Sequence, residues 1–237
     1  APVYLRERDE SVFPLEIITV GGDDILMILP GDRALTIAVK LSAAFEEAMK
    51  GTGVSLSVGV ALGRASTPVQ VLYNTAVDLL KGSAKRRRAE SEVSTGFIDF
   101  HDLTREGLPS PTVKKFRDQR QYQYRYEPEN IDLFTTGRPY HHMQLAQLLH
   151  WAQTLAIPES QLYGISETFD LGKERSTLYY LYQCSRMKKA HLAQFEALEA
   201  ALTAGNRAQS ADFPWLPLGD GSLYTPLKDL ALLRSLF

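Results

Sequence analysis

The segment LEIITVGGDDILMILP, residues 15–30, constrains the fold of this chain most strongly. Two apolar runs flank Gly21 and Gly22, and glycine readily takes the positive backbone dihedrals of a two-residue hairpin turn. Both runs are almost continuously apolar instead of alternating, a pattern typical of strands that are buried on both faces. The segment therefore predicts two central antiparallel strands that meet at the glycines.

The segments that follow predict further helices and strands. Apolar residues recur at helical spacing after Asp32, and Gly51 supplies a stop signal. Residues 54–63 alternate small and apolar side chains as in a strand, a second helix begins near Thr67, and residues 94–103 are expected to form another strand. This order predicts an α+β domain with helices on one face of a mainly antiparallel sheet.

The rest of the chain divides into a connector and a helical region. Several prolines interrupt residues 106–137, which have few aliphatic side chains and are expected to connect two domains. In residues 138–237 apolar side chains recur at helical spacing, which predicts an all-α C-terminal domain. We therefore expect three parts: a first domain over residues 1–105, the connector and the helical domain.

Composition narrows the class of protein. The chain has 237 residues, 44% of them hydrophobic, which is enough to bury a core, and its formal net charge of -2 argues against coating nucleic acid by bulk charge. A single cysteine, Cys184, excludes an internal disulfide, and no apolar run is long enough to cross a bilayer. A cytoplasmic location without a membrane partner fits best. The first residues have neither an initiator methionine nor a signal-peptide core, as in a processed or truncated piece of a longer protein.

The predicted hairpin is also a candidate chemical site. Glycines at its tip let phosphate groups approach the backbone, and Asp23 and Asp24 offer the hard oxygen ligands that Mg²⁺ or Mn²⁺ prefers. Two such ions support nucleotidyl transfer when they clamp a phosphate and activate a hydroxyl. Glycine and aspartate are also the commonest residues of plain turns, so these four residues alone leave both interpretations open.

Three elements in this order resemble the palm domain shared by GGDEF-type cyclases and the large polymerase-like subunit of type III CRISPR effector complexes. The resemblance covers residues 12–105 and rests on VGGDDILMILPG, VSLSVGVAL and AVDLLKGSAKRRR. It implies a ferredoxin-like palm in which Asp23 and Asp24 are catalytic and bind Mg²⁺ or Mn²⁺. The nucleotide-binding residues that it implies are Gly21, Gly22, Ser57 and Lys85.

The resemblance also implies a reaction and partners. In antiviral defence, the palm joins ATP into cyclic oligoadenylate: the 3'-hydroxyl of one ATP attacks the α-phosphate of another, and pyrophosphate leaves. The implied partners are ATP, other CRISPR effector subunits, and guide and target RNA. A complete palm has a further strand and helices before the hairpin, whereas about fourteen residues precede it here.

Two alternatives stay open. In the first, the chain is a non-catalytic assembly or RNA-binding subunit of an RNA-guided complex, and its palm is degenerate. The other alternative is a GGDEF-type diguanylate cyclase, which the Asp-Asp hairpin followed by Ile25 disfavours, because that group usually has phenylalanine at this position.

Basic and aromatic residues alternate in KKFRDQRQYQYRY, residues 114–126. Such a segment can bind single-stranded RNA, because its Lys and Arg side chains bind phosphates and its aromatic rings stack on bases. The same alternation is also typical of an edge strand. The candidate RNA contacts are Lys114, Lys115, Arg117, Arg120 and Arg125.

Histidines form a second group of polar candidates. His141, His142 and His150 lie near one another on a predicted helix, but no cysteine or acidic residue stands at ligand spacing around them, which disfavours a zinc site. His101 and Asp102 end the last predicted strand of the palm and are expected at the surface.

Overall fold

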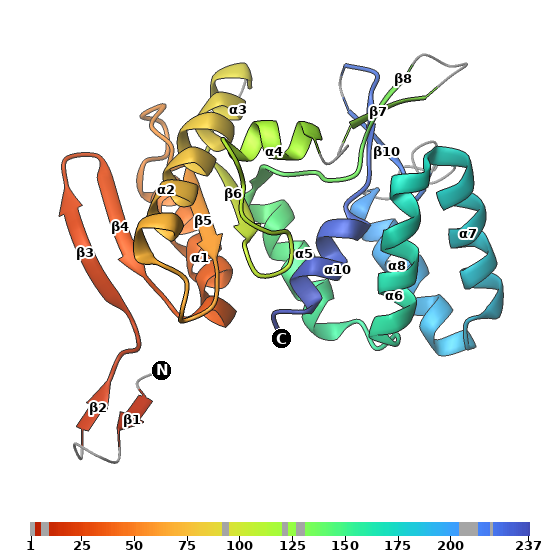
Figure 1. Cartoon of the computed structure of the whole chain (residues 1–237), viewed down its shortest axis with the longest axis horizontal. Helices are drawn as coiled ribbons and strands as arrows, with labels where there is room; N and C mark the ends of the chain where they lie inside the picture. Colours follow the sequence, from red (N-terminus) through yellow and green to blue (C-terminus); the bar gives the residue numbers. More distant parts are fainter. Residues whose placement is uncertain are drawn as a thin grey trace.

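The structure, a computed structural model, describes residues 3–5, 10–91, 95–119, 123–126, 131–203, 213–218 and 220–237. Figure 1 shows the palm region on one side and the helical region on the other. The strands are β1 (Val3–Leu5), β2 (Glu10–Val12), β3 (Glu16–Gly21), β4 (Asp24–Ile28), β5 (Val58–Leu62), β6 (Phe97–Asp102), β7 (Gln123–Tyr126), β8 (Ile131–Phe134), β9 (Tyr140–His141), β10 (Leu216–Pro217) and β11 (Leu223–Tyr224). The helices are α1 (Gly31–Ala48), α2 (Val69–Leu79), α3 (Lys85–Glu90), α4 (Val113–Gln119), α5 (His142–Thr154), α6 (Glu159–Thr168), α7 (Lys173–Arg186), α8 (Lys189–Leu202) and α10 (Leu227–Arg234).

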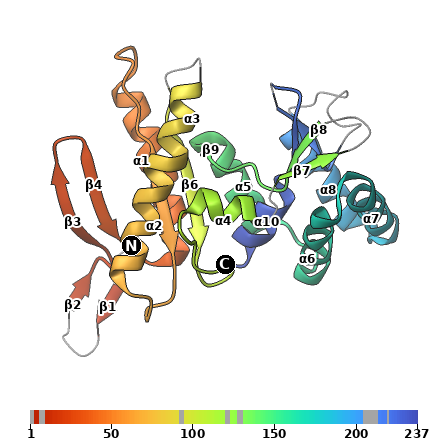
Figure 2. The same cartoon turned by 45° about the horizontal axis from the view of Figure 1, so that its top comes forward.

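The predicted hairpin forms, but its strands are not central. β3 and β4 pair antiparallel with each other and with no other described strand. Every residue of β3 is exposed, and Val20 is 68% exposed. In Figures 1 and 2 the ribbon stands to one side of α1 and α2. The expectation of covered strands was wrong for this structure, because no described element covers either face of these apolar residues.

A separate three-stranded sheet forms the centre of the palm. β5 and β6 are parallel, and β9 joins β6 antiparallel, so the sheet is mixed instead of mainly antiparallel. Helices cover both of its faces, whereas one covered face was expected. On one face Ile98 and Phe100 pack in the core with α1 and α5 residues; on the other a Cβ on Gly59 would overlap the backbone of Ala76 in α2. Glycine at position 59 therefore lets α2 lie directly against β5.

The second helix of the palm has an unusual continuation. As predicted, it continues into the basic run, but Leu80–Ala84 form a π-helical turn between α2 and α3. Such turns insert one residue into a helix and often occur at functional positions. Here the turn contacts β5 and β6 and places Ser83 and Arg86 beside the start of α4.

The chain is α+β, with a palm followed by a mostly helical region, as the sequence predicts. Short strands nevertheless extend into this region, where β10 and β11 continue a four-stranded sheet with β8 and β7. The expected connector, residues 106–137, contains α4, β7 and β8. β9 lies just after the expected boundary at residue 138 and pairs with β6 of the palm. The division into three parts stays a prediction, and these elements show that the parts share sheets.

One hydrophobic core runs through both regions. It joins side chains of α1, β5 and β6 to those of α5, α6, α8 and α10. Trp215 lies fully buried in it and donates from Nε1 to the Ser176 hydroxyl at 3.0 Å. The palm sheet and the helical region are therefore packed as one body by apolar burial.

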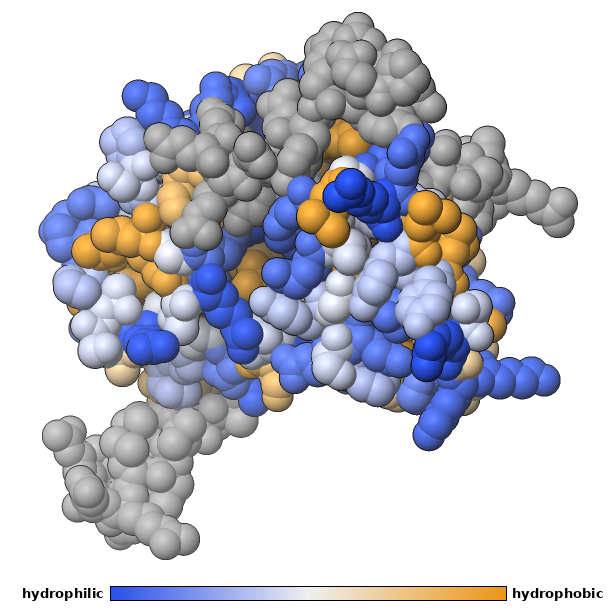
Figure 3. All heavy atoms as spheres, turned by 45° about the vertical axis from the view of Figure 1, so that its right-hand side comes forward, coloured by the Kyte–Doolittle hydropathy of each residue, from blue (hydrophilic) through white to orange (hydrophobic). Residues whose placement is uncertain are grey.

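The surface is mixed in character. Figure 3 shows one face of the molecule, on which hydrophobic side chains form separate patches between polar ones. Exposed apolar residues occur on α7, where Leu178 is 68% exposed, and above all on the hairpin. Among the described residues, no helix combines the length and apolar character needed to span a bilayer.

Candidate functional site

The tip of the hairpin carries the residues that the sequence singles out as a metal and nucleotide site. Gly21 pairs with Asp24 at the end of the ribbon, and Gly22 and Asp23 form the turn between them. Gly22 has φ 61°, a conformation that favours glycine, and no atom within 4 Å would meet a Cβ there. Both carboxylates are exposed, so phosphate and metal can reach them from solvent.

The donor set of this tip fits magnesium in part. Mg²⁺ binds through one or two carboxylates and completes its shell with water and substrate phosphate oxygens. Asp23 and Asp24 supply that number of carboxylates. No third acidic or histidine side chain joins them in a metal-binding group within the described part of the chain. The tip therefore supplies two exposed carboxylates, and metal binding there stays a prediction.

The structure does not bring the other two predicted nucleotide contacts to the tip. Lys85 is exposed at the first position of α3, and Ser57 is half-buried just before β5. The Ser57 hydroxyl is buried without a hydrogen-bond partner among the described residues. In Figures 1 and 2 the hairpin stands apart from both β5 and α3. Roles for Ser57 and Lys85 in nucleotide binding stay predictions.

The basic segment at residues 114–126 has two different parts. Lys114 and Lys115 are exposed on α4, whereas Arg117 is held inside the protein by Asp99, with Nη1 2.9 Å from Oδ2. Arg117 also donates to the Phe100 carbonyl at 3.0 Å, so the structure gives it an internal contact in place of the free basic surface that was expected. Arg120 lies outside the described residues, and Arg125 lies in β7, where side chains are not described.

A pocket of about 220 Å³, lined by both charged and apolar residues, lies beside α4. Arg86, Lys114, Arg117 and Arg138 all line it, and Asp78 lies at its edge, where its Oδ2 accepts a hydrogen bond from the Val113 backbone at 2.6 Å. Arg117 and Arg138 are neutralised by buried carboxylates. Lys114 is thus an exposed cation at this pocket.

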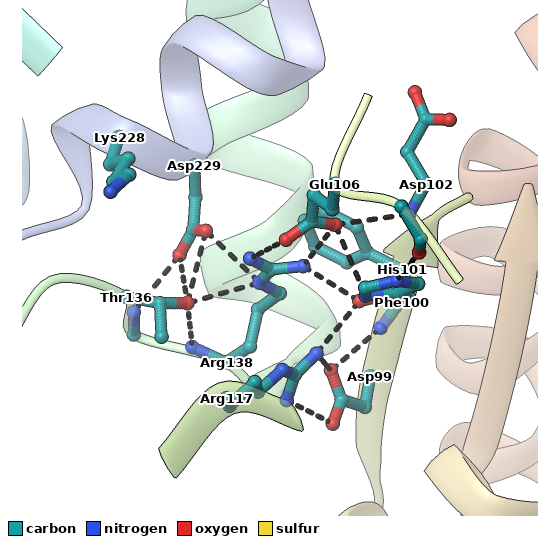
Figure 4. A network of polar contacts seen from close by, with 12 residues as sticks. Asp99, Phe100, His101, Asp102, Glu106, Arg117, Thr136, Arg138, Lys228 and Asp229 are labelled. Atoms are coloured by element: carbon teal, nitrogen blue, oxygen red, sulfur yellow. Dashed lines mark hydrogen bonds and ion pairs between the residues drawn. The ribbon is translucent and has the colours of Figure 1, made fainter. Parts of the chain in front are cut away.

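A buried network of charges lies next to this pocket (Figure 4). Arg138 Nη2 lies 2.8 Å from Glu106 Oε1, and its Nε lies 3.0 Å from Asp229 Oδ1. Asp229 also accepts hydrogen bonds from Thr136 and, at 2.6 Å, from the Tyr140 hydroxyl. The network joins the end of β6, the segment before β9, and α10.

Mutual pairing shifts the pKa values of these groups. Burial by itself would raise the pKa of Glu106, but the charge and hydrogen bond of Arg138 outweigh burial and lower it. Burial raises the pKa of Tyr140, and the neighbouring Asp229 carboxylate raises it further. Burial lowers the pKa of His101, although Glu106 acts in the opposite direction. At neutral pH the network therefore contains an ionised Glu106 and a neutral His101.

Sequence reasoning missed this network. His101 and Asp102 were expected at the surface, but they are 0% and 4% exposed. His101 lies against Phe116 of α4, and its Nε2 lies 2.8 Å from the Gly107 carbonyl oxygen. The partners come from the loop after β6, from α4 and from α10, so no local pattern points to them. A charged residue such as Asp229 within the leucine-rich α10 was the available signal.

Comparisons with known proteins match the part of the chain that contains the hairpin. Residues 9–93 match the family model described as Cas10/Cmr2, second palm domain. The chain is also 31% identical over 95 residues to the CRISPR system Cmr subunit Cmr2 of Pyrococcus furiosus, a match that covers 38% of this chain and 10% of that protein. The chain thus spans about a tenth of the length of this relative.

The matched region contains the hairpin, α1, β5, α2 and α3, the elements on which the palm resemblance rests. Residues 9–93 are therefore similar to the second palm domain of the Cas10/Cmr2 family, the kind of palm that the sequence resembles.

Proposed function

We propose that this palm binds ATP with Mg²⁺ or Mn²⁺ at the β3–β4 hairpin and joins ATP into cyclic oligoadenylate within a type III CRISPR complex. The observation that supports the proposal is the hairpin tip itself. It exposes Asp23 and Asp24 beside two glycines, in a region that matches the Cas10/Cmr2 palm.

The residues of the tip would divide the work of nucleotidyl transfer. Asp23 and Asp24 would hold the metal ions, which when bound lower the pKa of the attacking 3'-hydroxyl and neutralise the transferring phosphate. Gly21 and Gly22 leave room for the triphosphate next to the backbone. Lys85 would offset phosphate charge once it is brought near the tip.

A further strand would complete this site. Among the strands that the structure describes, β5 pairs with β6 alone, and both outer edges of the hairpin ribbon are unpaired. Unpaired edges with apolar side chains favour addition of another strand. We propose that a strand from a longer chain or from a partner subunit lies between the hairpin and β5, which would bring Ser57 and the carboxylates into one sheet.

The test is calorimetric titration of ATP with Mg²⁺ or Mn²⁺ into the chain and into an Asp23→Ala, Asp24→Ala double variant. Asp32→Ala is the matched control, because Asp32 is also exposed and lies in the first turn of the helix after the hairpin. We expect binding by the parent and the control, and at least tenfold weaker binding by the double variant. Equal binding by the parent and the double variant would contradict the proposal, and preference for GTP over ATP would support a diguanylate cyclase.

The second candidate is a non-catalytic assembly or RNA-binding subunit. It is supported by the exposed Lys114 at the pocket beside α4 and by a hairpin that lacks a third metal ligand among the described residues. This function requires that the Asp23→Ala, Asp24→Ala variant still assembles with effector subunits and RNA while the parent makes no oligoadenylate. Oligoadenylate synthesis by the parent complex and its loss in the variant would exclude this candidate.

A further inference from the structure

Three side chains from distant parts of the sequence meet where α1 faces the start of α5. Glu46 lies on α1, His141 ends β9, and His142 is the first residue of α5. Glu46 Oε2 lies 3.3 Å from His141 Nε2 and 3.2 Å from His142 Nδ1. These three atoms all lie within 4.8 Å of one another, and the two imidazole centroids are 4.1 Å apart.

We propose that Glu46, His141 and His142 bind one divalent transition-metal ion of the zinc class, with water as a further ligand. Two imidazoles and a carboxylate are the donor set of three-ligand zinc sites. Ligand atoms at about 2.0–2.1 Å from a tetrahedral zinc ion are roughly 3.3 Å apart. Glu46 keeps this separation from both histidines, and the ligand atoms of the three residues lie within 4.8 Å of one another.

The surroundings of the three residues suit a cation. A metal ion binds imidazole through a ring nitrogen that carries no proton. The buried Nδ1 of His142 has no hydrogen-bond partner among the described residues, although it faces the Glu46 carboxylate. Glu46 is 41% exposed at its side chain, which leaves solvent access for water and for the ion.

A second layer of contacts orients the ligands. The Thr95 hydroxyl lies 3.4 Å from Glu46 Oε2, and the Gln144 side chain accepts from the His141 backbone N–H at 3.3 Å. His141 Nδ1 accepts from the Met143 N–H at 3.3 Å, which places the ring proton on Nε2, toward Glu46. An ion at Nε2 replaces that proton, which moves to Nδ1, and the Met143 N–H gives up this long hydrogen bond.

The ion would connect the two regions of the protein. Glu46 belongs to the palm, whereas His141 and His142 begin the mostly helical region, 95 positions later in the sequence. A ligand that binds the folded chain stabilises it by mass action, so bound metal would oppose separation of α1 from α5. This proposal uses no residue of the hairpin and does not depend on ATP chemistry.

The experiment titrates Zn²⁺ into metal-stripped chain that carries Asp23→Ala and Asp24→Ala, so that hairpin carboxylates add no second site. Calorimetry gives affinity and stoichiometry, and Co²⁺ absorption reports the coordination geometry. Glu46→Gln keeps the shape of the side chain and removes the anionic ligand, and His141→Asn keeps a residue that favours the N-cap of α5. His150→Ala is the matched control, because His150 is exposed on the same helix.

We expect one Zn²⁺ per chain, a higher Tm with Zn²⁺, and a tetrahedral Co²⁺ spectrum. Glu46→Gln and His141→Asn should each weaken Zn²⁺ binding at least tenfold, while His150→Ala leaves it unchanged. If Glu46→Gln fails to fold, His141→Asn decides the result. Absence of Zn²⁺ binding, unchanged affinity in the ligand variants, or equal loss in His150→Ala would show that these residues form only a hydrogen-bonded cluster.

Discussion

Arg138 Nε lies 3.0 Å from Asp229 Oδ1, and the two side chains are 2% and 0% exposed. The same guanidinium binds Glu106 and donates to the carbonyl of Phe100 at 2.8 Å. It therefore connects the palm sheet to the last helix of the chain. The net attraction within a buried ion pair contributes little to stability, but removing one partner is costly because it leaves the other charge buried and uncompensated.

We expect Asp229→Ala to lower the free energy of unfolding by about 3–5 kcal/mol, because it leaves part of the Arg138 charge and the Tyr140 hydroxyl buried without a partner. Chemical denaturation measures this loss. The control is Asp170→Ala, which removes a partly exposed ion pair with Lys228 and should cost less than about 1 kcal/mol. Equal losses in the two variants would show that the buried network has no special role in stability.

Stability should fall on acidification because of Glu106 and His101. Both pKa values are lower in the folded chain than the ordinary 4.5 and 6.5, so the unfolded chain binds more protons. His101 contributes stability that is lost as pH falls below about 6.5, and the contribution of Glu106 is lost below about 4.5.

The His101 contribution is tested by measuring the free energy of unfolding of the parent and of His101→Gln across pH 4 to 8. Glutamine keeps a donor for the Gly107 carbonyl but does not titrate. Between pH 5 and 6.5, the free energy of unfolding of the variant should depend less steeply on pH than that of the parent, by up to ~1.4 kcal/mol per pH unit. Identical slopes in the two proteins would rule out His101 as the titrating group.

The exposed hairpin should contribute to assembly more than to stability. Val20 is 68% exposed, so Val20→Lys should change the free energy of unfolding of the chain by no more than about 0.5 kcal/mol. A lysine disfavours pairing at a strand edge, and co-purification with effector subunits should decrease. Leu145→Ala, at a fully buried site, is the contrast and should cost about 2–5 kcal/mol. Normal assembly of Val20→Lys would mean that the ribbon is not an interface.

Lys114 and Arg117 should respond differently although both were predicted to contact RNA. Lys114→Ala should leave stability unchanged and reduce the dependence of log affinity for single-stranded RNA on log salt by roughly 0.7, the value for one phosphate contact. Arg117→Ala should destabilise the fold, because it leaves the buried Asp99 carboxylate unpaired. Fluorescence anisotropy over a salt series, with denaturation of each variant, separates the two roles. An unchanged salt slope in Lys114→Ala would remove it from the RNA surface.

Local patterns in the sequence were enough to predict the hairpin, both palm helices and the strands β5 and β6. These elements depend on turn residues and on apolar spacing within a few positions, which a sequence displays directly. The same patterns pointed to the palm family, which the match over residues 9–93 confirms. They failed to predict that the hairpin is exposed. An apolar run indicates that a strand is buried when the protein is assembled, but it does not show which segment buries it.

Contacts between distant residues were decided by the tertiary structure alone. Glu46 meets His141 across 95 positions, and Arg138 meets Asp229 across the length of the helical region. Histidines without a nearby acidic residue gave no metal signal in the sequence, because the carboxylate arrives on another helix. The sequence by itself determined the hairpin, the two palm helices, the strands β5 and β6, and the family that the palm resembles. Folding determined which charges are buried together, since a charge enters a protein interior only where a distant partner offsets the loss of water.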